Sequence, residues 1–212
     1  MFAYFFFFGA TACYIIASTK IVASQYGISD DSATTITAIS SLINGLARIP
    51  WGMLVDKIGY RWSIFIGGAL SFASMLAIDV CVKSVDDNAK ATMFGVVWTI
   101  CSIVTSGFYM VMCGIVPHYF GSTYADEIFG ILNFAYAGCV IFLSIIKPGL
   151  ENLEETHGQF LPFCFIGICG LIGGLTCLVL PAKPLPKLQA AEDSGLPFSM
   201  TGSRRPRISQ AI

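Results

Sequence analysis

The chain has 212 residues, of which 55% are hydrophobic and only 12% are charged, and its net charge is −1. A soluble domain usually has roughly twice that charged fraction, so the composition argues against a soluble fold. The near-neutral charge provides no basic field that would attract nucleic acid. A mean hydropathy of +0.74 indicates a protein that resides in a lipid bilayer.

Six apolar segments are long enough to cross a bilayer, which takes roughly 20 residues each. They are expected at 2–25, 33–55, 63–82, 92–116, 127–147 and 159–181. The first lacks the basic leader of a signal peptide and has too long an apolar run for one. The sequence therefore predicts an all-α membrane protein with a six-helix domain at 1–181. A polar, disordered cytoplasmic tail is expected at 182–212.

Basic residues are unevenly divided between the two sets of connections. One set has three: Lys83, Lys90 and Lys147. The other has seven: Lys57, Arg61, Lys183, Lys187, Arg204, Arg205 and Arg207. Because cytoplasmic loops have the excess of Lys and Arg, both termini are expected in the cytosol.

The eight cysteines mostly lie inside apolar runs, and no two of them form a C-x-x-C pair. They are interpreted as packing residues, with a metal or disulfide framework as the alternative. Neither histidine lies mid-span, no G-x-S-x-G motif occurs, and no acidic pair lies within a span. We therefore expect no cofactor, no metal and no enzymatic activity.

A compact motif lies between the second and third expected spans, in the stretch GLARIPWGMLVDKIGYRW. It follows the spacing G-x-L-x-D-[RK]-x-G-[RK]-[RK], with Tyr60 in place of one basic residue. The matching residues are Gly52, Leu54, Asp56, Lys57, Gly59 and Arg61. This motif resembles the cytoplasmic loop signature of the major facilitator superfamily of transporters, where it acts in conformational switching. The alternative is an ordinary charged loop.

The spacing of the motif also has physical reasons. Gly52 would let two helices approach closely, as small residues do in membranes. Gly59 suits a tight turn with positive φ. Asp56 could accept hydrogen bonds near the N-terminus of the third span.

Arg48 lies eight residues before Asp56, which places it ~12 Å deeper along a helix. An arginine at that depth costs ~2.5–3.5 kcal/mol on the insertion scale. We therefore expect Arg48 to face a water-filled or protein-lined cavity and to hold an anion or an acidic partner. The alternative is a structural arginine paired with helix carbonyl groups.

The stretch INGLARIPWGMLVDKIGYRW is also similar to the oxalate/formate antiporter branch of the superfamily, with Asn44 and Gly45 before a substrate-binding arginine at Arg48. FFFFGATACYIIASTKIVASQYGIS and FGILNFAYAGCVIFLSIIKPG look like two further spans of that branch, so the resemblance covers most of residues 3–150. It implies a secondary active transporter, an antiporter of small organic anions that works by alternating access.

The sequence departs from that branch at Tyr136, where the oxalate carriers have a lysine. Two fixed cations suit a dicarboxylate, whereas one arginine with a hydroxyl neighbour suits a single carboxylate or a zwitterion. Asn44 stands where the related monocarboxylate carriers have an aspartate. Asn133 shares a helix face with Tyr136, so both either contact substrate or form interhelical hydrogen bonds. The candidate substrate-binding residues are Arg48, Asn44, Tyr136 and Asn133, with Tyr14 and Tyr109 as further candidates of the same kind.

Facilitator proteins have twelve spans in two homologous halves, each a 3+3 inverted repeat. The absence of an arginine from 92–116 and the long polar tail favour the C-terminal half. Since Met1 begins inside an apolar run, we expect a fragment whose partner is the missing N-terminal six-helix half. One alternative is a half-size protein that works as a homodimer. Another is a non-transporting half-carrier or membrane sensor that functions only with a partner.

Overall fold

The computed structural model describes residues 1–121, 125–157, 159–176 and 179, and all regular structure within them is helical. The five helices are α1 (Phe2–Gln25), α2 (Asp30–Lys83), α3 (Asp87–Phe120), α4 (Ala125–His157) and α5 (Phe160–Leu175). Four of them, α1 to α4, contain segments long and apolar enough to cross a membrane. An integral, multi-pass membrane protein follows from these helices.

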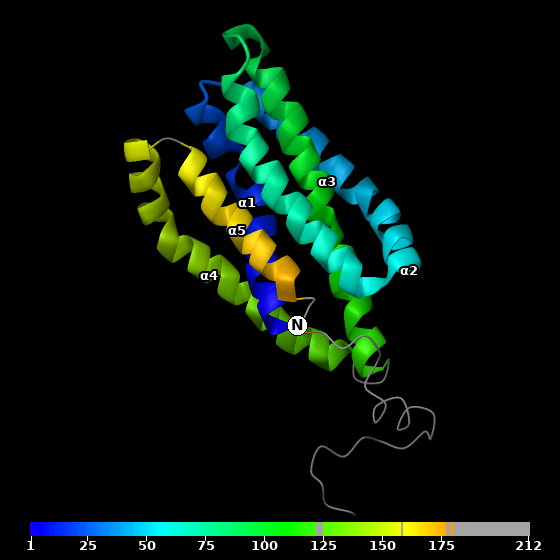
Figure 1. Ribbon diagram of the computed structural model, residues 1–212. Helices are drawn as coiled ribbons and strands as arrows, with labels where there is room; N and C mark the ends of the chain where they lie inside the picture. Colours follow the sequence, from blue (N-terminus) through cyan, green and yellow to red (C-terminus); the bar gives the residue numbers. More distant parts are fainter. Residues whose placement is uncertain (122–124, 158, 177–178, 180–212) are drawn as a thin grey trace, which may run out of the picture.

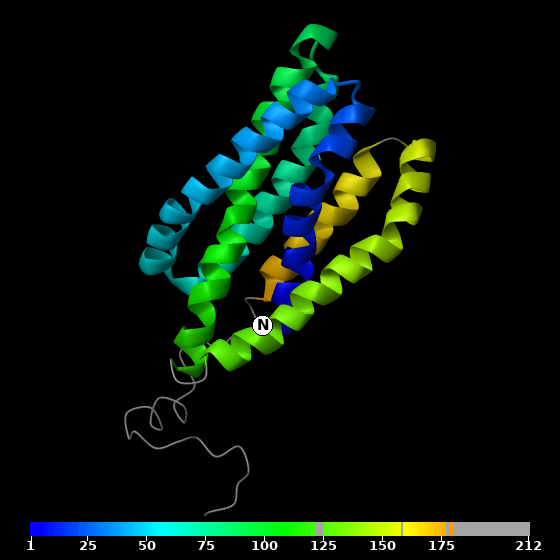
Figure 2. The same cartoon turned by 180° about the vertical axis from the view of Figure 1, so that it is seen from behind.

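Helix α2 contains two of the expected spans, because it is bent back on itself at Gly59 (Figures 1 and 2). Its first arm (residues 30–58) and its second arm (residues 60–83) run in opposite directions. Gly59 has φ 79° and ψ 163°, a region of backbone space that is essentially open to glycine alone. The predicted positive φ at this glycine is confirmed. The loop expected between the two spans is reduced to one non-helical residue.

The remaining helices differ from the expected spans mainly at their ends. α3 and α4 extend beyond 92–116 and 127–147, whereas α5 has 16 residues and ends before 181. Met1, the bend at Gly59, the end of α3 and the end of α5 lie at one end of the bundle (Figure 1). This matches the predicted grouping of the connections. The cytosolic location of that end, the six crossings and the inverted repeat stay predictions. The expected tail at 182–212 lies outside the described residues.

The second arm of α2 packs directly against α5 through glycines. A Cβ atom added to Gly68 would lie 2.5 Å from the Cα atom of Gly174. A Cβ atom added to Gly173 would lie 2.8 Å from the backbone nitrogen of Phe8 in α1. These three helices therefore approach one another at backbone distance, as small residues permit in membrane proteins.

A polar cluster lies at the opposite end of the bundle from Gly59. Asp79 is only 5% exposed, although it lies near the end of the second arm. Its two carboxylate oxygens accept hydrogen bonds from the hydroxyl of Tyr26 and from the ammonium group of Lys83, both at 2.8 Å. The cluster ties the turn after α1 to α2.

Candidate functional site

Three helices meet around Arg48, which lies on the first arm of α2. The guanidinium carbon of Arg48 is 4.9 Å from the centre of the Tyr109 ring on α3, a cation–π arrangement. The hydroxyl of Tyr109 is 3.0 Å from the hydroxyl of Tyr136 on α4. Arg48 is thereby connected through Tyr109 to Tyr136, two residues that the sequence analysis had placed in the same candidate site.

The Arg48 side chain is exposed and makes no ion pair or hydrogen bond with any residue that the structure describes. The predicted alternative, pairing with helix carbonyl groups, is therefore not observed within the described residues. The Tyr109 ring contacts the guanidinium through its π face, which leaves the N–H edges of the fork available. A planar fork of this kind matches the two oxygens of a carboxylate.

The two asparagines have different partners. The side-chain nitrogen of Asn44 donates a hydrogen bond to the carbonyl oxygen of Ser102 on α3 at 2.7 Å, and the side chain is buried. Asn133 donates to the carbonyl oxygen of Phe129, one turn earlier in α4, at 3.0 Å. In this structure Asn44 is therefore an anchor between α2 and α3, and Arg48 and Tyr136 form the core of the candidate site.

Tyr109 is more central than the sequence indicated, because it contacts both Arg48 and Tyr136. Its ring also lies 5.3 Å from the ring of Phe108, and the ring of Tyr136 lies 5.9 Å from Phe108 in a stacked arrangement. The buried Phe108 ring therefore supports both tyrosines. The sequence signal for Tyr109 was an aromatic residue with a polar tip within an apolar run, which does not by itself indicate a neighbour.

The residues of the loop motif occupy the bend of α2. Gly52 is buried against α3, where an added Cβ atom would lie 3.0 Å from the methyl group of Met110. Its predicted role in close helix contact is consistent with this distance. Asp56 and Lys57 are exposed, and Asp56 makes no hydrogen bond or ion pair with a described residue. The expected hydrogen bonds from the following helix to Asp56 are thus absent from the described part of the chain.

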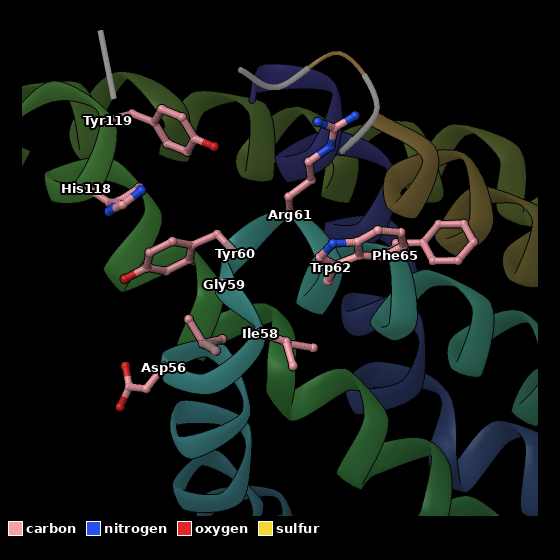
Figure 3. Close-up of a pocket in the computed structure, with 10 residues that line it drawn as sticks. Asp56, Ile58, Gly59, Tyr60, Arg61, Trp62, Phe65, His118 and Tyr119 are labelled. Atoms are coloured by element: carbon pink, nitrogen blue, oxygen red, sulfur yellow. The ribbon is translucent and has the colours of Figure 1, made fainter. Parts of the chain in front are cut away.

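A hollow of about 900 Å³ lies at the bend, between the motif residues and the end of α3 (Figure 3). Asp56 and Arg61 lie on opposite sides of Gly59 in this region. Tyr60, the departure from the motif, packs on α3: its ring is 4.8 Å from the ring of His118, and its hydroxyl would lie 2.5 Å from a Cβ atom added to Gly114. An aromatic contact to α3 therefore stands where the motif usually has a charge.

The sequence matches the family model described as Major Facilitator Superfamily over residues 1–210. The chain belongs to the major facilitator superfamily. No curated protein and no solved structure gives a significant match to this facilitator. Members of the superfamily are transporters rather than enzymes, so the bend at Gly59 and the Arg48 cluster are parts of a transporter fold.

Proposed function

We propose that this facilitator chain forms part of a secondary transporter that binds a small organic anion, preferably a monocarboxylate, and exchanges it by alternating access. The observation that carries the proposal is Arg48, whose fork has no acidic partner among the described residues and is held on the face of Tyr109. A charge-assisted, bidentate bond to a carboxylate would satisfy that fork.

The tyrosine pair next to Arg48 supports a single-carboxylate substrate. The hydroxyl groups of Tyr109 and Tyr136 are 3.0 Å apart. Each can donate a hydrogen bond to a second polar group on the solute or accept one from it. Tyr136 stands where the similar oxalate carriers have a lysine. A hydroxyl in place of that second cation disfavours a second carboxylate, because the charge would remain unpaired.

We also propose that the Arg48 face is covered by a partner, either an N-terminal six-helix half or a second copy of this chain. Arg48 is exposed in the single chain, and a charge facing lipid at this depth is unfavourable. Large apolar side chains surround it at helical spacing on the same arm and are also exposed: Ile39, Leu42, Leu46, Ile49 and Met53. A second bundle packed on this face would enclose Arg48 in a protein-lined cavity.

The experiment measures equilibrium binding and flux of labelled mono- and dicarboxylates with the protein reconstituted in vesicles, with and without a co-expressed partner half. We expect Arg48→Gln to weaken monocarboxylate binding about tenfold or more, since a hydrogen bond to a charged group contributes about 1.5–3 kcal/mol. The affinity of Arg48→Lys should lie between that of the unchanged protein and that of Arg48→Gln, because lysine keeps the charge and loses the fork.

Lys20→Gln provides the matched control, because it removes a cation from an exposed position on α1. Unchanged affinity in Arg48→Gln would show that the arginine is structural and would remove the support for an organic anion. Binding without flux, even with the partner present, would favour the non-transporting sensor.

A further inference from the structure

Two cysteines from different helices lie side by side at the middle of the bundle. The sulfur atoms of Cys13 on α1 and Cys139 on α4 are 3.9 Å apart. The helices come this close because Gly9 lies one turn before Cys13. A Cβ atom added to Gly9 would lie 3.0 Å from the Tyr136 ring and 3.5 Å from the Cys139 sulfur.

We propose that Cys13 and Cys139 are a modification site, a thiol pair that forms a reversible disulfide between α1 and α4. A disulfide has a sulfur–sulfur bond of about 2.05 Å, so each sulfur has to move by about 1 Å, within reach of a small χ1 rotation. The Cys139 thiol now donates to the carbonyl oxygen of Tyr136 at 2.8 Å, and it gives up that weak bond when the disulfide forms.

The oxidant is hydrogen peroxide, a small neutral molecule. The thiolate of one cysteine attacks a peroxide oxygen, which yields a sulfenic acid and, after protonation of the leaving oxygen, one water. The second thiol then attacks the sulfenic sulfur and displaces the hydroxyl as a second water. In sum, two thiols lose two electrons and two protons to one peroxide, which becomes two waters. Cys13 is half-buried, so its sulfur is partly exposed to a molecule as small as peroxide.

The disulfide has a structural consequence that does not depend on the proposed substrate. Cys139 lies three residues after Tyr136, on the same side of α4. The bond would fix that side of α4 against α1 and close a loop between residues 126 positions apart. Closing a long loop restricts the unfolded chain and raises the stability of the oxidised protein.

The test uses the full chain in nanodiscs, treated with hydrogen peroxide, blocked with N-ethylmaleimide, digested and analysed by mass spectrometry. We expect one peptide pair joined through Cys13 and Cys139, two hydrogen atoms lighter than its separate parts, which dithiothreitol releases. The midpoint of thermal unfolding should rise on oxidation and return on reduction.

Cys139→Ser should abolish both effects, and Cys113→Ser, which removes an exposed thiol from α3, should leave both intact. The disulfide is mapped in the chain with its wild-type sequence, so a folding defect in a variant does not affect that result. The proposal is overturned if Cys13 and Cys139 are recovered only as blocked thiols, if other cysteine pairs form in equal yield, or if the bond forms without a change in the unfolding midpoint.

Discussion

The two arms of α2 have similar apolar sequences and are attached to the bundle in different ways. The first arm is connected to α3 by three side-chain hydrogen bonds: Ser40 to Thr99, Asn44 to the carbonyl of Ser102, and Trp51 to the carbonyl of Ile103. The second arm meets α5 at backbone distance through Gly68 and Gly174. The contact of the first arm with α3 therefore includes polar side chains, whereas the contact of the second arm with α5 depends on glycines.

Both arms expose large apolar side chains, such as Leu42 at 67% on the first arm and Val80 at 60% on the second. The exposed cation within the apolar stretch, Arg48, lies on the first arm. Hydrogen-bonded side chains can exchange partners, whereas a glycine contact leaves no room for adjustment. The comparison indicates that the contact of the second arm with α5 tolerates no added side chain, and that the first arm carries Arg48, the centre of the proposed site.

The largest effect is expected at the glycine contact. Gly68→Leu would place side-chain atoms inside the backbone of α5, and no rotamer of leucine can avoid an overlap that begins at Cβ. We expect loss of the folded protein, measured by size-exclusion chromatography in detergent. Gly45→Leu on the first arm is the matched control, because a Cβ atom there has no neighbour within 4 Å. Equal yields of folded protein from the two variants would contradict the inference that the contact between Gly68 and α5 tolerates no side chain.

The second largest effect is expected where the arms join. Gly59→Ala forces a side chain into backbone angles that are essentially open to glycine alone, and it should destabilise the bend by about 2 kcal/mol. If this motif couples the two arms during transport, flux should fall more than equilibrium binding of the solute. Gly130→Ala is the control, because Gly130 lies in α4 and a Cβ atom there has no neighbour within 4 Å. A loss of binding equal to the loss of flux would argue against a switching role.

A smaller effect is expected at the polar cluster of the second arm. Asp79→Ala removes the acceptor from Tyr26 and Lys83, and it should lower the free energy of unfolding by about 1.5 kcal/mol. Denaturant unfolding in detergent measures the change. Asp87→Ala, which breaks an exposed pair with Lys90, should have little effect. A similar decrease in the free energy of unfolding in both variants would show that the burial of Asp79 adds nothing to the stability that its hydrogen bonds provide.

The smallest effect is expected at the cation–π contact between Arg48 on the first arm and Tyr109 on α3. Tyr109→Leu removes the ring under the guanidinium, and since a cation–π contact contributes about 1 kcal/mol, anion binding should weaken about fivefold. Tyr109→Phe keeps the ring and loses the hydroxyl, so it should retain most of the affinity. Equilibrium binding of a monocarboxylate distinguishes the two. An equal loss in the two variants would mean that the hydroxyl pair, rather than the ring, supports binding.

Features that depend on local composition and spacing could be predicted from the amino-acid sequence alone. Long apolar runs predicted helices of membrane-spanning length, and the loop motif identified the superfamily before any contact was known. The positive φ of Gly59 also followed from the sequence, because few other residues tolerate those angles. These properties depend only on the residues of each segment and on the surrounding solvent, so the sequence predicts them without knowledge of tertiary contacts.

Which side chains contact one another could not be predicted from the sequence, because it depends on how the helices pack. Asn44 donates to a carbonyl 58 residues away, and Tyr109 reaches Tyr136 across 27 residues, contacts that depend on how the helices pack. The thiol pair of Cys13 and Cys139 depends in the same way on the close approach at Gly9. A helical pattern indicates which residues share a face, but the rotation and depth of each helix are set by its neighbours.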